Sequence, residues 1–161
     1  RHVSMRNRLT SIFASDEFIY PMISLRFRQN MVRNTILITR TSAVCTTNAN
    51  FEIVIVANPV FDTNQPDQAQ WIPVPLSSLE YDINRGSTQN FNRIVDDNSV
   101  IEIDGYHISI SGDADNRDSN IAISLGTSAL GVRDEVCLCV RKVSNINNER
   151  FSSSLTFKEI V

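Results

Sequence analysis

The sequence predicts an all-β protein, an antiparallel β-sandwich or jelly-roll-like domain of eight or nine strands with little helix. Short runs rich in Ile and Val recur along the chain, and Gly, Asn, Asp or Ser bounds each run. Helical periodicity is weak, with its best candidates a turn or two at "MRNRLTSIF" and "LSSLEYD". A chain of 161 residues is normally one domain, so we expect a single domain over residues 1–161.

The first clear strand is "ISLRFRQN", in which apolar and polar residues alternate. One predicted face holds Ile23, Leu25 and Phe27, and the other holds Ser24, Arg26 and Arg28. Such alternation is typical of a half-buried strand. A second strand follows at "NTILITRT", bounded by Asn34 and Thr41.

The strongest strand pattern is "FEIVIVANP", which is apolar on both faces apart from Glu52. A strand of this kind is expected inside a sheet, covered on both sides. Asn58 and Pro59 end it.

Residues 58–93 form a long connection rich in Pro and Asn, with four of the five prolines and the single Trp. We expect one short strand within it, from Trp71 to Val74. Long loops inside a compact domain are usually functional. The candidate binding residues of this connection are Trp71, Tyr81, Asn64, Gln65, Asp67, Asn90 and Asn92.

After residue 100, "IEIDGYHISIS" predicts two strands around a tight turn at Asp104, Gly105 and Tyr106, since glycine accepts a positive φ. Three further strands are expected at "NIAISLG", "EVCLCVRKV" and "SSLTFKEIV". These complete the sandwich or jelly roll.

The predicted turn would bring Glu102, Asp104 and His107 close together, which suggests a hydrolase using His107 and Ser109. His107 and Ser109 are, however, two residues apart on one strand, and the strained GxSxG turn of many serine nucleophiles is absent from the sequence. We therefore predict that the protein is not an enzyme and keep the His107 hydrolase as a residual alternative.

The segment "GDADNRDSN" offers oxygen ligands for Ca²⁺ at Asp113, Asp115, Asn116 and Asp118. It departs from the EF-hand pattern, because Arg117 occupies a ligand position and no Glu closes the loop. The alternative is a turn in which Asp and Asn bond their own backbone. We expect no other cofactor.

Cys45, Cys137 and Cys139 are an odd number, which argues against a full disulfide framework. Cys137 and Cys139 lie two apart on a predicted strand and cannot easily bridge. We expect them to pack as small side chains.

Positive charge is concentrated near the start of the chain, where residues 1–40 hold seven Arg against two acidic residues. Residues 41–131 hold three Arg against twelve acidic residues. This polarity suggests a basic arm over residues 1–17 and an interface to an anionic partner or a neighbouring chain at Arg6, Arg8, Arg26 and Arg28. The alternative is that Arg26 and Arg28 are the outward residues of a strand. Nucleic-acid contact by the arm is only weakly supported, since such patches are usually denser.

Of the fifteen basic residues only Lys142 and Lys158 are lysine, and Asn, Ser and Thr are abundant. Interfaces are typically depleted in Lys and enriched in Arg. No apolar run is long enough to span a membrane.

These features predict a non-enzymatic structural or attachment domain. The best match is a viral capsid or protruding particle-surface domain that self-associates and presents loops to a host receptor or glycan, which would place it in the virion. The alternative is a lectin-type sandwich, in which Trp71 or Tyr81 stacks on a sugar and Ca²⁺ is a potential ligand.

Overall fold

The computed structural model describes residues 2–6, 10–12, 19–28, 34–45, 51–62, 66–85, 94, 101–108, 114–126, 132–142 and 149–160. These residues form strands, turns and extended segments but no helix, so the all-β prediction is confirmed for them. Accordingly, this part of the chain contains no helix of the length and hydrophobicity that membrane crossing requires.

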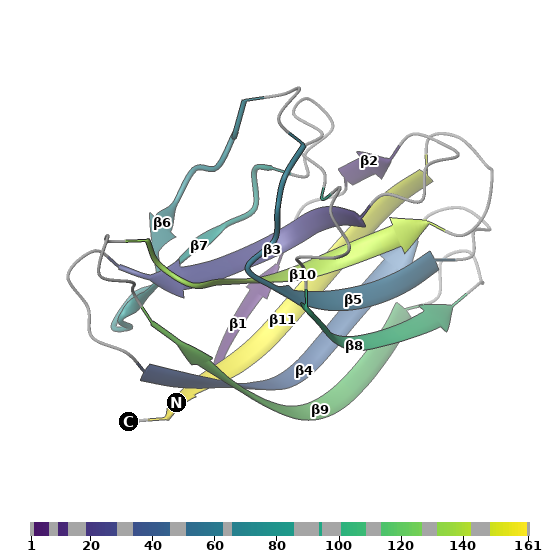
Figure 1. Ribbon diagram of the computed structural model, residues 1–161. Coiled ribbons are helices and arrows are strands. Elements are labelled where there is room, and N and C mark those ends of the chain that lie inside the picture. The colour runs from purple at the N-terminus through teal and green to yellow at the C-terminus, as the bar shows by residue number, and fades with distance from the viewer. Residues whose placement is uncertain are drawn as a thin grey trace.

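The strands form two antiparallel sheets (Figure 1). Sheet A has the order β1-β11-β4-β9, and β2 also pairs with β11. Its strands are β1 (His2–Arg6), β2 (Thr10–Ile12), β4 (Asn34–Cys45), β9 (Ala114–Leu125) and β11 (Glu149–Ile160). Sheet B has the order β6-β7-β3-β10-β5-β8. Its strands are β3 (Ile19–Phe27), β5 (Phe51–Ala57), β6 (Ile72–Pro73), β7 (Leu79–Asp82), β8 (Ile101–Ile108) and β10 (Glu135–Lys142).

The main hydrophobic core joins the two sheets. Phe27 of β3 belongs to the same buried cluster as Ile38 of β4 and Phe157 of β11. Ile23 and Leu25 join it, whereas Ser24 and Arg26 make their contacts outside it. The predicted alternation is therefore confirmed over residues 23–27, where Ser24 and Arg26 face away from the core.

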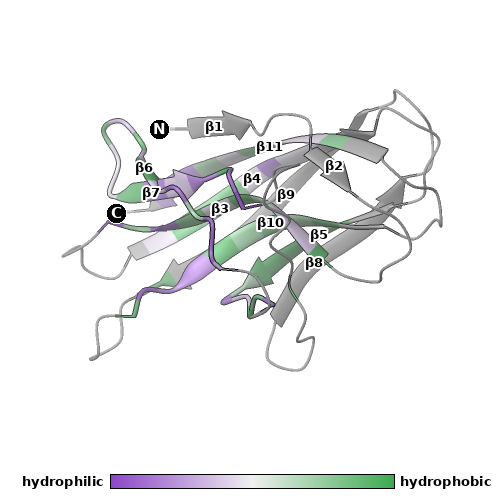
Figure 2. Cartoon of the chain, turned by 90° about the horizontal axis from the view of Figure 1, so that it is seen from above, coloured by the Kyte–Doolittle hydropathy of each residue, from purple (hydrophilic) through white to green (hydrophobic). Residues whose placement is uncertain are grey.

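A second apolar cluster lies on the outer face of sheet B. Val54 and Val56 of β5 contribute to it, as do Cys137 and Cys139 of β10. The partly buried Phe61 of the long connection packs against them, and Ile94, the residue after that connection, belongs to the same cluster. The prediction that this strand is covered on both faces is confirmed for residues 53–56, and Figure 2 shows the described part of β5 as hydrophobic.

The tight turn predicted at Asp104, Gly105 and Tyr106 is wrong, because β8 runs through these residues as one strand. Gly105 pairs with Val54 in the ladder, and the register shifts where Asp104 pairs with Ile55 but Glu102 with Val56. Glycine inside a strand often accompanies such a bulge, so the glycine that suggested a turn is accommodated by an irregular strand.

Other expected boundaries also change. Strand β9 begins at Ala114, so most of the predicted acidic loop is strand, and β4 continues past Thr41 to Cys45. The basic arm predicted over residues 1–17 contributes β1 and β2, both paired with β11. The helical turns proposed at "MRNRLTSIF" and "LSSLEYD" are replaced by strands and a turn in their described parts. In each place cross-strand pairing supplies the backbone hydrogen bonds that local patterns did not reveal.

Candidate functional site

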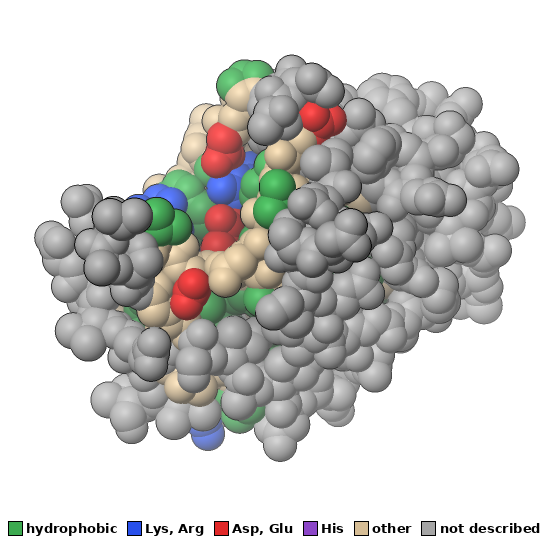
Figure 3. Space-filling view, viewed as in Figure 1, with side chains coloured by type: hydrophobic (Ala, Val, Ile, Leu, Met, Phe, Trp, Pro, Cys, Tyr) green, Lys and Arg blue, Asp and Glu red, His purple; other side chains and the backbone are tan. Residues whose placement is uncertain are grey.

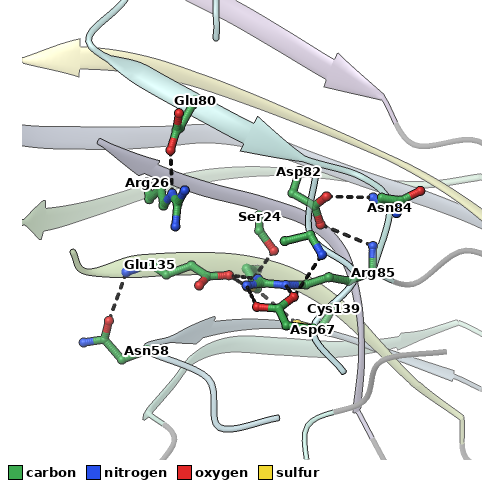
Figure 4. Close-up of polar contacts among 12 residues, drawn as sticks. Ser24, Arg26, Asn58, Asp67, Glu80, Asp82, Asn84, Arg85, Glu135 and Cys139 are labelled. Atoms are coloured by element: carbon green, nitrogen blue, oxygen red, sulfur yellow. Dashed lines mark hydrogen bonds and ion pairs between the residues drawn. The ribbon is translucent and has the colours of Figure 1, made fainter. Parts of the chain in front are cut away.

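The described polar side chains are concentrated on the outer face of sheet B, around Arg85. Arg85 follows β7, and its side chain is only 4% exposed. Its Nε donates to Asp67 Oδ1 at 2.8 Å and its Nη2 to Asp67 Oδ2 at 3.0 Å. Its Nη1 donates to Glu135 Oε1 of β10 (Figure 4). Burial alone would lower the pKa of Arg85, but the two carboxylates outweigh it and raise that pKa above its usual value.

Asp82 sets the position of Arg85 through the backbone. Its Oδ1 accepts hydrogen bonds from the amides of Gln70 at 2.8 Å and Asn84 at 3.1 Å. Its Oδ2 accepts from the amide of Arg85 at 3.3 Å. Asn84 Nδ2 then donates to the Gln68 carbonyl at 2.6 Å. One buried carboxylate thus ties residues 68–70 to the turn after β7, which favours a single placement of the Arg85 side chain.

A second group of charges surrounds Glu80 of β7. Its Oε1 accepts from Arg26 Nε at 2.6 Å and from Arg133 Nη1 at 3.0 Å. Arg133 Nη1 also donates to the Phe27 carbonyl at 3.0 Å. The Arg26 guanidinium carbon lies 3.9 Å from the centre of a Trp71 ring, and that of Arg85 lies 5.2 Å away. Trp71 therefore links the two charge groups through cation–π contacts.

Beneath the charges, β3 and β10 place Ser24 and Cys137 in contact. Ser24 Oγ lies 2.9 Å from Cys137 Sγ, and Cys137 Sγ lies 3.3 Å from Glu135 Oε1. Burial raises the pKa of the Cys137 thiol well above its usual value. A thiol in this state is a poor nucleophile. Cys137 and Cys139 are both free and buried, so the prediction that they pack as small strand side chains is confirmed.

The arrangement can fasten chain segments together. Arg26, Arg85 and Arg133 each contact at least one carboxylate among Asp67, Glu80 and Glu135. Figure 3 shows acidic and basic side chains side by side on this face. Their effect is to hold residues 66–85 against β3 and β10. In the described part of the chain, no group of His, Cys, Asp or Glu is arranged to hold a metal ion.

Of the predicted binding residues, Asp67 and Trp71 belong to this cluster, although the contacts are made within the chain. Tyr81 instead packs against the main core, as a partly buried side chain. Asn64, Gln65, Asn90 and Asn92 lie outside the described residues. Sequence reasoning missed Arg85, Glu80, Asp82 and Glu135. The available signal was Arg85 itself, a basic residue isolated within an acidic stretch.

The arginines predicted to form an interface are placed as follows. Arg28 donates to the carbonyls of Val74 at 2.6 Å and Leu79 at 3.3 Å, and Arg26 pairs with Glu80. Arg26 is an outward residue of β3 and Arg28 directly follows that strand, and both make intramolecular contacts. Arg6 lies in β1 opposite Ser154, and Arg8 is outside the described residues. Their role toward an anionic partner stays a prediction.

The arrangement behind the His107 hydrolase alternative is not observed. Glu102, Asp104 and His107 lie along one strand, so Glu102 and His107 are about 17 Å apart at roughly 3.4 Å per residue. His107 pairs with Glu52 of β5 in the ladder, and Ser109 is outside the described residues. The absence of the turn thus removes the proximity on which this alternative depended.

The calcium ligands were predicted on a loop, but three of them lie on β9. Asp115, Asn116 and Asp118 pair with Ala43, Ser42 and Arg40 of β4, and Asp113 is outside the described residues. An extended backbone separates these residues more than a calcium loop does. Calcium binding stays a prediction.

The fold and the polar cluster define the class of protein, which is an all-β domain of two antiparallel sheets with a polar cluster that holds one connection against sheet B.

No protein-family model matches the sequence, and no curated protein matches it. A chain of the Israeli acute paralysis virus full particle, heated to 63 degrees, is 9% identical. The alignment covers 98% of this chain and 69% of that chain, with a TM-score of 0.42.

A chain of the infectious bursal disease virus VP2 subviral particle is 10% identical. The alignment covers 96% of this chain and 42% of that chain, with a TM-score of 0.13. At these TM-scores the two likenesses are too distant to carry an argument about function.

Proposed function

We propose that the chain is a non-enzymatic structural domain of a virus particle, a coat or protruding surface domain that associates with copies of itself. The observation that carries the proposal is the strand order. Without the short strands β2, β6 and β7, each sheet has four strands. Their order is β1-β11-β4-β9 in sheet A and β3-β10-β5-β8 in sheet B. Along the chain the strands change sheet after every strand except between β5 and β8.

This order supports the proposal of a jelly roll, in which eight strands form two sheets connected as two Greek keys. Jelly rolls recur in viral capsid domains and in lectins, so the fold favours these two classes of protein but does not distinguish between them. The surface composition favours the structural role. With two Lys among fifteen basic residues, the chain has the Lys depletion and Arg enrichment of interfaces.

The polar cluster supports the same proposal. A catalytic or sugar-binding site needs side chains that are free to meet a ligand. Here the three arginines of the cluster contact carboxylates, and Arg26 covers part of a Trp71 ring. This arrangement is better suited to holding a long connection in a fixed shape, as a surface that contacts other chains requires. Presentation of loops to a host receptor, and a location in the virion, belong to this proposal.

The test is the solution mass of the purified chain, measured by size exclusion with light scattering over a hundredfold range of concentration. The proposal expects a dimer, trimer or larger assembly, and electron microscopy then shows whether particles form. A strict monomer of 18.1 kDa at every concentration contradicts it.

The lectin-type alternative makes a different prediction. Binding on a glycan array, with and without Ca²⁺, should be lost in Trp71→Ala and retained in Trp71→Phe if the indole stacks on a sugar. Equal binding by both variants removes Trp71 from that alternative.

A further inference from the structure

The two carboxylates that contact Arg85 differ in their exposure to solvent. Glu135 of β10 accepts from Nη1, and its side chain is 15% exposed. Asp67 of the long connection accepts from Nε and Nη2, and its side chain is 56% exposed (Figure 4). Arg85 itself is buried. Asp67 therefore covers the solvent side of a buried guanidinium group.

The Arg85 guanidinium has supports that do not involve Asp67. Glu135 holds Nη1, and Asp82 accepts from the Arg85 amide at 3.3 Å. The guanidinium carbon lies 4.4 Å from the centre of the Phe61 ring. With these contacts in place, Nε and Nη2 should keep their direction when Asp67 leaves. Donors that are fixed in advance lose little conformational entropy when they bind a ligand.

The segment that carries Asp67 makes no contribution to the hydrophobic core. Residues 66–73 include no buried residue, and none of them belongs to either apolar cluster. Val74, the next residue, is buried in the main core. Displacement of Asp67 therefore requires no core side chain to move, and its main cost is the loss of hydrogen bonds that an incoming acceptor replaces.

The two donors also restrict the chemistry of the ligand. Nε and Nη2 form one edge of the planar guanidinium, and this edge matches the two oxygens of a carboxylate. Among the described residues, Asp67 is the acceptor for both. Because Glu135 places a negative charge beside them, a doubly charged phosphate would be repelled more strongly than a singly charged carboxylate. The fitting ligand is therefore one carboxylate group.

We propose that Arg85 is a carboxylate-binding site which the isolated chain fills with its own Asp67, and that a carboxylate of another molecule can take the place of Asp67. Until that exchange, the pair holds the connection against sheet B and leaves neither donor free. The ligand is an acidic side chain of a protein or a small free carboxylate, since both offer the same two oxygens. The inference goes beyond the proposed function and does not depend on self-association.

The decisive variant is Asp67→Ala, which removes the internal carboxylate and leaves Arg85 in place. Acetate should bind this variant with a Kd of roughly 10–100 mM, as expected of one charge-assisted contact. Trp71 reports the binding, because it is the only tryptophan and its ring centre lies 5.2 Å from the Arg85 guanidinium carbon. Its fluorescence is titrated with sodium acetate and, at the same ionic strength, with sodium chloride. Equal responses to the two salts overturn the proposal.

Three controls test whether the acetate lies at Arg85. The wild type should bind acetate roughly tenfold more weakly or worse, because Asp67 competes at a high effective concentration. Asp67→Asn keeps a side chain of the same size in the site and should also bind more weakly than Asp67→Ala. Adding Arg85→Lys to Asp67→Ala keeps the charge but loses the paired donors, so the response to acetate should fall.

The outcomes of these controls are decisive in either direction. If the wild type and Asp67→Asn bind acetate as tightly as Asp67→Ala, the acetate lies elsewhere and the proposal is overturned. This comparison does not require the Arg85 variant to fold. A Tm of Asp67→Ala that rises more in acetate than in chloride would support the site independently of fluorescence.

A capped tripeptide with one aspartate between two glycines distinguishes the two sources of the carboxylate. Its matched control has asparagine in the same place. Binding of the aspartate peptide to Asp67→Ala, without binding of the asparagine peptide, assigns the site to an acidic side chain of a protein. Binding of acetate alone assigns it to a small free carboxylate, and binding of neither overturns the proposal.

Discussion

Arg85 and Asp67 are joined by two parallel hydrogen bonds, of 2.8 and 3.0 Å, between a buried guanidinium and a largely exposed carboxylate. Arg85 also contacts Glu135 of β10, so one side chain connects the long connection to sheet B. The paired geometry fixes direction as well as distance, as bidentate contacts between arginine and carboxylate do. Several measurable consequences depend on this side chain and its neighbours.

Replacing Arg85 with methionine should lower the free energy of unfolding by about 3–5 kcal/mol, the usual cost of removing one partner of a buried ion pair. The cost arises because Glu135, with a side chain 15% exposed, loses a cationic partner. Asp67→Asn should cost much less, since the Asp67 side chain is 56% exposed and well solvated. Urea denaturation measures both variants, and equal losses would contradict the leading role given to Arg85.

The same pair predicts a dependence of stability on pH. The hydrogen bond from Arg85 is the largest cause that lowers the pKa of Asp67 below its ordinary value of 3.8. A lowered carboxyl pKa contributes stability that is fully present above the unfolded value and is lost as pH falls through the folded value. The difference in stability between wild type and Asp67→Asn should therefore be constant above about pH 5 and shrink below about pH 4. Urea denaturation of the two proteins at matched pH gives this difference, and a constant difference down to pH 2 would contradict the assignment.

The backbone conformation and the side chain of Asn58 should contribute separately to the stability of the fold. Its φ is 52°, its Oδ1 accepts from the Glu135 amide at 3.0 Å, and its Nδ2 donates to Asp134 at 3.2 Å. Asn58→Ala loses the hydrogen bonds and places an alanine in the left-handed region, so we expect a loss of about 2 kcal/mol. Glycine adopts the left-handed conformation without strain, so Asn58→Gly loses only the hydrogen bonds. We expect its free energy of unfolding to fall by about 1 kcal/mol. Thermal unfolding of both variants shows which one loses more stability. A larger loss in Asn58→Gly than in Asn58→Ala would exclude the backbone conformation as the cause of the difference.

Cys137 should resist alkylation in the native protein. Burial is the largest cause that raises the pKa of its thiol, and Ser24 and Glu135 surround the sulfur. Because the thiolate is the reactive form, iodoacetamide at pH 8 should modify Cys137 at least a hundredfold more slowly in the native chain than in urea. Mass spectrometry of the peptides measures both rates. Native modification at the rate of the unfolded chain would show that the connection does not cover this strand.

Several strands could be predicted because their patterns are local. The alternation in "ISLRFRQN" follows directly from the two faces of β3, one in the main core and one toward Glu80 and Trp71. The doubly apolar pattern of β5 reflects two buried clusters on opposite faces of sheet B. Such patterns repeat every second residue, so a short window of sequence is sufficient to read them.

The failures have a common cause in contacts between distant residues. Gly105 suggested a turn, but pairing with Val54 of β5 draws it into a strand. The acidic residues after it suggested a loop, but β4 pairs with them over the whole of β9. Local preference for a turn is weak compared with a full ladder of backbone hydrogen bonds, and no window of sequence shows which strand will be the neighbour.

By itself the sequence determined that this is a β protein, which of its alternating and doubly apolar runs become strands, and that the chain is poor in Lys. Tertiary structure alone decided that Arg85 meets Asp67 and Glu135, residues 18 and 50 positions away, and that Leu76 is fixed in an exposed, left-handed conformation by Arg28 and Glu159. The physical reason is that strand patterns depend on the side-chain alternation of neighbouring residues, whereas ion pairs and exposed tips depend on which strands lie side by side.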